Sequence, residues 1–198
     1  MTAQESLSLL REGNIRFSSG RAERPHQDES RRIFLDDNGQ NPFSAVLSCS
    51  DSRVPVEIIF DRGKGDIFVV RTAGNLDGEG ETGSLEYAVE HLNVPLIVIL
   101  GHSNCGAVTA VVDHCEAHGR IKSIACRIAV TVEETEHVKP SLNHRDFIDA
   151  CSRENVRKVV EHLRLESDII REALEKGNLK IAGAYYDIRS GVVDWLDR

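Results

Sequence analysis

Short, almost continuous apolar runs alternate along this chain with segments whose apolar residues recur every three or four positions. The apolar runs are too short for helices and fit strands buried in a parallel sheet; they lie at residues 43–47, 66–71, 95–100, 179–185 and 192–196. The segments with helical spacing lie at residues 81–92, 104–117, 120–138, 143–166 and 167–176. This alternation predicts an α/β fold with a mainly parallel central sheet of about five strands, flanked by helices.

Two further helical segments precede the first expected strand. Residues 3–18 have an amphipathic pattern, and residues 28–36 form a shorter helix in which Ile33 and Leu35 face inward. The two helices pack either on a neighbouring subunit or on the core of their own chain, and periodicity alone favours neither. We expect a single domain over residues 1–198, with a helical arm at 1–38 and an α/β core at 39–198.

Composition narrows the classes of function. The 198 residues are 40% apolar, enough for one domain with a sizeable core, and the formal net charge of −8 argues against a nucleic-acid partner. Because no apolar stretch reaches about 18 residues and no signal pattern opens the chain, we expect no membrane association and a cytoplasmic protein. Five scattered cysteines fit reduced thiols better than a disulfide framework.

Side chains that bind metals follow two of the expected strands. Cys49 and Asp51 come after the first strand, and His102 and Cys105 come after the third. Sites in open α/β sheets form at the carboxyl ends of the strands, so we expect these side chains to meet. Two thiols, an imidazole and a carboxylate match zinc in number and kind. Arg53 follows Asp51 by two residues and can pair with it, which would take the carboxylate off the metal.

Each of these residues alone has a plainer interpretation. A lone cysteine at a strand end is usually a small buried hydrophobe, and a lone histidine there is usually a hydrogen-bonded core residue. Asp51 and Arg53 alone could form a helix cap and a surface salt bridge. A short helix to about Phe60 is expected next, with Asp51 or Ser52 as N-cap and Pro55 in its first turn. Taken together at equivalent strand ends, the residues favour a metal site.

Four longer runs resemble the β-class carbonic anhydrases. These are CSDSRVP at 49–55, GDIFVVRTAGN at 65–75, GSLEYAVEHLNV at 83–94 and GHSNCGAV at 101–108. Weaker similarity at 12–17 (EGNIRF) and 183–191 (GAYYDIRSG) extends the resemblance over nearly the whole chain. The paired CxDxR and HxxC motifs are highly specific.

The resemblance implies a zinc-dependent enzyme that reversibly hydrates carbon dioxide to bicarbonate and a proton, by attack of zinc-bound hydroxide. Zinc would be held by Cys49, His102 and Cys105, with Asp51 in the fourth position of a closed state and water in that of an open state. Asp51 and Arg53 would be the catalytic pair, with Arg53 holding the carboxylate off the metal. The family usually places its site at a dimer interface, so we expect a homodimer or homotetramer.

The resemblance also implies a small substrate pocket. Gln40 matches the position whose amide hydrogen-bonds bicarbonate, and Phe68 and Tyr87 match apolar and aromatic wall positions. Without the resemblance, these residues are a loop amide and two ordinary core aromatics. The remaining cysteines are expected on helices and inert; they are Cys115, Cys126 and Cys151.

Three rival functions need separate tests. A non-catalytic zinc module would keep the cysteines and histidine but have no use for a carboxylate gated by Arg53. A thiol redox enzyme would want two close cysteines, as in Cys-x-x-Cys, and the sequence has none. A hydrolase of the same fold that acts on carbonyl sulfide or carbon disulfide would use the same ligands, and its substrates are linear like carbon dioxide. The intact motifs and the polar Gln40 favour carbon dioxide.

Overall fold

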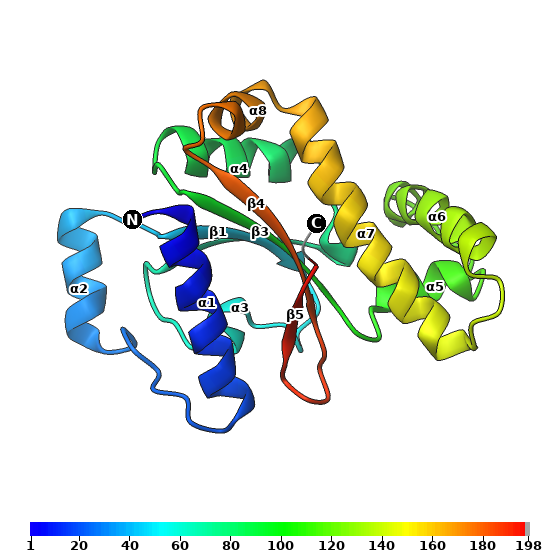
Figure 1. The fold of residues 1–198 in the computed structure, drawn as a ribbon, viewed down its shortest axis with the longest axis horizontal. Coiled ribbons are helices and arrows are strands. Elements are labelled where there is room, and N and C mark those ends of the chain that lie inside the picture. The colour runs from blue at the N-terminus through cyan, green and yellow to red at the C-terminus, as the bar shows by residue number, and fades with distance from the viewer. Residues whose placement is uncertain (197–198) are drawn as a thin grey trace.

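A five-stranded sheet forms the centre of the computed structural model, which describes residues 1–196 (Figure 1). Its strands are β1 (Ser44–Cys49), β2 (Ile67–Thr72), β3 (Leu96–His102), β4 (Lys180–Tyr186) and β5 (Val193–Trp195). They are arranged in the order β2-β1-β3-β4-β5; the first four run parallel, and β5 is antiparallel to β4. The predicted α/β fold with a mainly parallel sheet is confirmed.

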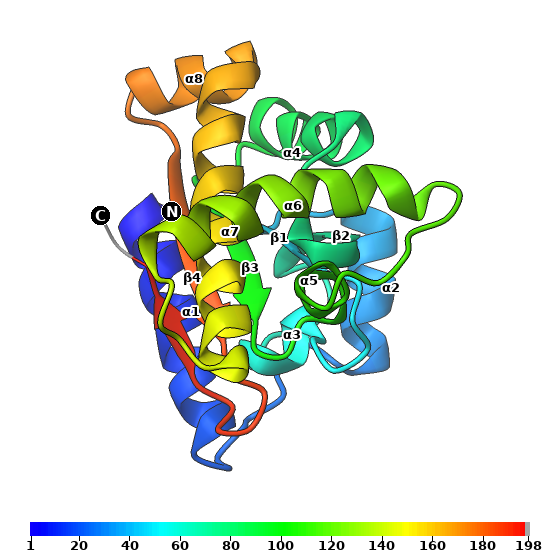
Figure 2. The same cartoon turned by 90° about the vertical axis from the view of Figure 1, so that its right-hand side faces the viewer.

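Helices cover both faces of this sheet. They are α1 (Ala3–Ser18), α2 (Glu29–Asn38), α3 (Val56–Ile59), α4 (Glu79–Glu90), α5 (Gly106–Val112), α6 (Ile121–Val138), α7 (His144–Glu166) and α8 (Asp168–Glu175). α4 to α8 contribute to the core on one face, and α1 and α3 contribute to the core on the other. α6 contacts both α5 and α7 (Figure 2). None of the helices in residues 1–196 is long and apolar enough to cross a membrane.

The continuous apolar runs are explained by burial on both sides of the sheet. Every residue of β1 and of β3 is buried. Successive side chains of a strand point to opposite faces, so Ala45 and Leu47 join the core beneath α4 to α8, while Val46 joins the core beneath α1 and α3. A strand with two covered faces needs apolar residues at every position.

Helix α1 packs on the core of its own chain. Leu10 is fully buried in the cluster that contains Val46 and Ile59. The buried Asn14 donates from Nδ2 to the carbonyls of Ile59 (3.2 Å) and Gly191 (2.9 Å), and its Oδ1 accepts from the Val193 N–H (2.9 Å). Of the two packing arrangements that periodicity left open for this helix, the structure shows packing on the core of its own chain. The division into a helical arm at 1–38 and a core at 39–198 stays a prediction.

Helix α2 differs from its predicted packing. Each of its residues is exposed or half-buried, and Ile33, expected to face inward, is 49% exposed. Leu35 is half-buried: its methyl groups lie close to Gly65, in the turn that leads into β2. The helix touches the rest of the chain through too narrow a surface to bury both apolar positions.

Other corrections concern the ends of helices. The N-cap of α3 is Pro55, not Asp51 or Ser52, because the Asp51 side chain is held by Arg53 while its carbonyl accepts the Val54 N–H in a turn (3.0 Å). Between the expected strand at 66–71 and the expected helix at 81–92, the chain contains a short 3-10 turn, η1 (Ala73–Asn75), and the start of α4, which begins at Glu79. α5 ends at Val112, so Cys115 lies outside a helix, contrary to the prediction. Cys126 and Cys151 are on α6 and α7 as expected.

We predict that Gly13→Ala destabilises the protein although alanine favours helices. A Cβ at position 13 would lie 1.8 Å from the Phe60 carbonyl oxygen, so α1 would have to move off α3. The free energy of unfolding, measured in urea, should fall by about 1–3 kcal/mol. Gly83→Ala in α4 is the matched control, because a Cβ there has open space. That change should raise the free energy by up to about 1 kcal/mol; a stabilised Gly13→Ala protein would contradict the packing of α1.

Candidate metal centre

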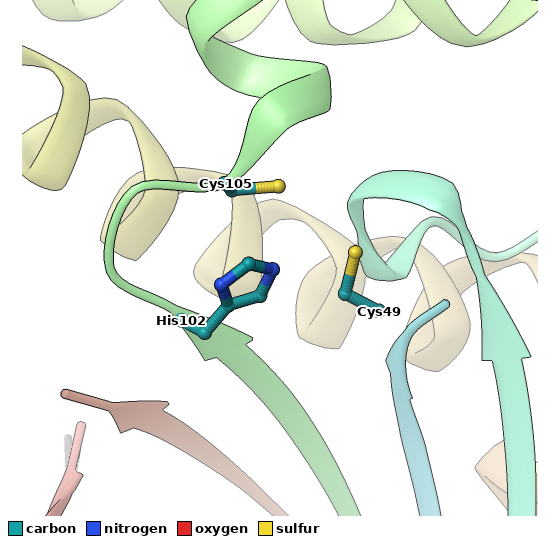
Figure 3. A group of neighbouring side chains, drawn as sticks. All are labelled: Cys49, His102 and Cys105. Carbon is teal, nitrogen blue, oxygen red and sulfur yellow. The ribbon is translucent and has the colours of Figure 1, made fainter. Parts of the chain in front are cut away.

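Three metal-binding side chains meet at the carboxyl ends of β1 and β3 (Figure 3). Cys49 is the last residue of β1, His102 is the last residue of β3, and Cys105 is the N-cap of α5. One ligand atom from each residue lies within 4.8 Å of the other two, and all three side chains are buried. The expectation that these side chains meet is fulfilled because β1 and β3 are parallel neighbours, which puts their ends side by side.

The loop between His102 and Cys105 has a local conformation that brings the two residues together. Asn104 adopts a left-handed backbone (φ 52°), which asparagine tolerates better than most residues. Ser103 ties the loop to the end of β4: its N–H donates to the Tyr186 carbonyl and its Oγ accepts from the Ile188 N–H, both at 2.9 Å. The turn therefore returns the chain toward the sheet, so that Cys105 faces His102.

The ring of His102 is held in one tautomer. Its Nδ1 lies 2.9 Å from the Ser103 carbonyl oxygen, which can only accept, so Nδ1 carries the proton and donates. Nε2 is then left with a lone pair, and this buried atom has no hydrogen-bond partner among residues 1–196. A buried polar atom without a partner is costly in free energy. Its position beside two sulfur atoms fits a metal ligand.

The two thiols strongly influence each other's ionisation. The Cys105 thiol donates to the sulfur of Cys49, which lowers the pKa of Cys49 well below its usual range. The pKa of Cys105 is raised, because the thiol is held as a donor and ionising it would put a second negative charge beside the first. A cation between the sulfurs would remove that penalty and let both thiols ionise. The donor set therefore fits a divalent metal with an affinity for thiolate and imidazole.

Asp51 lies beside this cluster and is paired with Arg53. Arg53 donates from Nε to Oδ1 (2.9 Å) and from Nη2 to Oδ2 (2.7 Å), and its backbone N–H donates to Oδ1 (2.9 Å). These bonds, chiefly those from the guanidinium group, lower the pKa of Asp51 to about 2. Asp51 Oδ2 is still 4.0 Å from His102 Nε2, and Arg53 Nη2 also donates to the Asn104 carbonyl (3.0 Å). Arg53 thus connects the loop after β1 with the loop after β3.

Arg71 is a further residue at the centre, and sequence reasoning missed it. From β2 it donates through Nε to the Cys49 carbonyl (3.0 Å) and through Nη2 to the Asp51 carbonyl (2.6 Å). In the pairing of β1 with β2, Arg71 lies opposite Ser48, and the next residue of β2 lies opposite Cys49. The sequence did contain one sign of such a role: Arg71 is a charged residue near the end of an otherwise apolar strand.

The three residues expected to line the substrate pocket lie away from the cluster of Cys49, His102 and Cys105. Phe68 lies near the amino end of β2, where it pairs with Ala45, whereas Cys49 pairs with Thr72 at the carboxyl end. Phe68 and Thr72 are four residues apart, which at about 3.3 Å per residue is about 13 Å along the strand. The Tyr87 ring lies 6.2 Å from the Phe68 ring, and Gln40 is exposed before β1 begins. The direction of the strands keeps these residues away from the metal centre of their own chain.

The family model, the relatives and the solved structure that match this chain are carbonic anhydrases. A family model for carbonic anhydrase matches residues 44–193. Carbonic anhydrase 2 of Mycobacterium tuberculosis is 41% identical over 189 residues, which cover 92% of this chain and 87% of the relative. Carbonic anhydrase of Pseudomonas aeruginosa is 37% identical over 168 residues, covering 80% of this chain and 74% of the relative. The solved β-carbonic anhydrase CcaA superposes with a TM-score of 0.77 at 28% identity, covering 98% of this chain and 93% of that one.

We predict that the Cys49→Ser, His102→Ala and Cys105→Ser variants each lose tightly bound zinc. Each change removes one of three ligand atoms from a site that fits a four-coordinate metal. Zinc content should be measured by mass spectrometry after dialysis against a chelator. Cys126→Ser is the control, since it removes an exposed thiol on α6 and should leave the zinc content unchanged. A ligand variant that keeps a full complement of zinc would exclude that residue from the centre.

Proposed function

The chain belongs to the β-carbonic anhydrase family, and we propose that it hydrates carbon dioxide at a zinc ion held by Cys49, His102 and Cys105. The observation that carries this proposal is the buried Cys–His–Cys cluster, in which His102 Nε2 has no protein partner among the described residues. Rapid carbon dioxide hydration kinetics on protein of known zinc content would test it. Faster turnover of carbonyl sulfide than of carbon dioxide would instead favour a hydrolase of the same fold.

The charges of the residues suit this role. Two thiolates and a neutral imidazole balance Zn²⁺, and a further carboxylate would make the site anionic and fill its fourth position. When bound, zinc supplies a Lewis acid that lowers the pKa of a coordinated water and so provides a nucleophile for carbon dioxide. Arg53 binds Asp51 at two points and holds it beside the metal position. A metal ion held by the three residues would then keep one position free for reaction.

The Asp51–Arg53 pair also gives the site a fixed hydrogen-bond acceptor. The pKa of Asp51 is about 2, below the ordinary 3.8, so the folded state favours the ionised carboxylate. That contribution to stability is present above about pH 4 and is lost as the pH falls through about 2. Between pH 5 and 9, Asp51 stays charged and accepts hydrogen bonds only. A change of activity with pH in that range arises from another group.

We predict that Arg53→Ala keeps zinc but lowers kcat/KM by between about 10- and 100-fold, since Asp51 is then free to turn onto the metal. Arg53→Lys should recover part of the loss, because one ammonium group cannot reproduce the two-point contact. Rates should be measured by stopped flow at pH 8. Arg171→Ala, which removes the exposed pair with Asp168, is the control. A zinc-loaded Arg53→Ala enzyme with the wild-type rate would exclude the gate.

We further propose that a second copy of the chain completes the substrate pocket. Gln40 and Tyr87 are exposed, Tyr87 by 46%, and Phe68 is half-buried. β2, which carries Phe68, is an edge strand of the sheet as residues 1–196 define it. Pairing two copies around this edge would cover these residues and bring them near the partner's metal centre. The expected roles of Gln40, Phe68 and Tyr87 would then be met across the interface.

Subunit mixing tests this arrangement. We expect Gln40→Leu and His102→Ala each to be nearly inactive alone. Co-expressed with different tags, the two variants should recover activity, because each mixed dimer has one site with an intact metal centre and an intact pocket. Random pairing predicts about a quarter of the wild-type activity. Co-expressing Cys49→Ser with His102→Ala, two changes in the same centre, is the control and should recover none. Absence of recovery in the first mixture would place the whole pocket within one chain.

A further inference from the structure

A backbone N–H group points at one of the two sulfur atoms of the metal centre. Gly74, in the η1 turn, donates its N–H to Cys49 Sγ at 3.4 Å, in a buried position. A hydrogen bond to a thiolate draws electron density from the sulfur, so it changes how strongly the sulfur donates to a metal. The orientation of the Gly74 peptide therefore affects the electronic character of the centre.

The conformation of Gly74 is unusual. Its φ is +72°, and a Cβ at this position would lie 3.0 Å from Ile128 Cδ1 on α6. Left-handed backbone and tight packing both favour glycine here. Because glycine populates several backbone conformations with similar energy, this residue needs an external contact to keep its N–H on Cys49.

Asn155 provides that contact from helix α7. Its Nδ2 donates to the Gly74 carbonyl at 2.8 Å, and the side chain is only 2% exposed. The two residues are 81 positions apart, and the helix bearing Asn155 packs against β3. The rigid helix thus fixes the carbonyl side of Gly74, while Cys49 Sγ receives its N–H.

The rest of the turn has separate anchors. Asp77, almost fully buried, is paired with Arg127 on α6 and with His162 on α7. These contacts hold the chain three residues beyond Gly74 and do not involve Asn155. Losing the Asn155 contact should therefore reorient the Gly74 peptide without releasing the whole loop.

We propose that Asn155 is a positioning residue for the metal centre: by holding the Gly74 carbonyl, it aims the Gly74 N–H at the Cys49 sulfur and sets the electron donation of that thiolate. The inference rests on the proposed function, since it requires Cys49 to be a metal ligand. Asn155 does not touch the reacting atoms. Its effect passes through one peptide unit to the sulfur.

Cobalt(II) substituted for zinc gives a readout that a merely structural role would not move. Cobalt–thiolate centres have a charge-transfer absorption band whose energy falls as the sulfur becomes more electron-rich. Asn155→Asp keeps the shape of the side chain and removes the amide donor, while Asn155→Leu removes the polar group altogether. Both cobalt-loaded variants should show the band at longer wavelength. The zinc-loaded variants should lose roughly tenfold in kcat/KM.

Ser152→Ala is the matched control on the same helix. Ser152 is as buried as Asn155, and its hydroxyl donates to Ile148 within α7 at 2.9 Å. This variant should keep the wild-type band. An unchanged band in a folded, cobalt-loaded Asn155→Asp or Asn155→Leu protein would overturn the inference. A wild-type protein that binds cobalt without any thiolate band would overturn the proposed centre itself, and the role of Asn155 with it.

Discussion

The centre depends on one hydrogen bond, from His102 Nδ1–H to the Ser103 carbonyl. That bond fixes which ring nitrogen has a lone pair, and burial at the end of β3 keeps the lone pair away from solvent. The lone pair left on Nε2 is the atom through which this ring could bind a metal. Parallel pairing of β1 and β3 then brings Cys49 to the same end of the sheet. The chemistry of the site therefore depends on the parallel pairing of β1 with β3 and on the tautomer of the His102 ring.

Around the candidate ligands, several long polar side chains bind backbone carbonyls. Arg71 holds the carbonyls of Cys49 and Asp51, Arg53 holds that of Asn104, and Asn155 holds that of Gly74. Each side chain comes from a part of the chain other than the loop whose carbonyl it holds: Arg53, in the loop after β1, binds the loop after β3. Loops near an active site have few internal hydrogen bonds, so such contacts supply the rigidity that a metal centre needs.

Much of this arrangement was readable from sequence. The buried runs at β1 and β3 and the motifs at their ends predicted where Cys49 and His102 would meet, since periodicity is a local property and sites in open α/β sheets form at the carboxyl ends of the strands. The contacts of Arg71 and Asn155 with backbone carbonyls were not predictable, because a carbonyl group is present at every residue and leaves no mark in the sequence. The early end of α5 and the exposure of Ile33 were missed for a related reason: helical spacing shows that a helix can form, not where its packing stops.

The two loops that form the centre come from distant parts of the chain. Arg53 and Asn104, which link the loops after β1 and β3, are 51 residues apart, with α3, β2, η1, α4 and β3 between them. Closing so long a loop costs conformational entropy before any ligand contact can offset it. Assembly of the sheet meets this cost, because pairing of β1 with β3 brings the two loops together. An ion bound by all three side chains would act as a cross-link between distant parts of the chain, much as a disulfide does in a secreted protein.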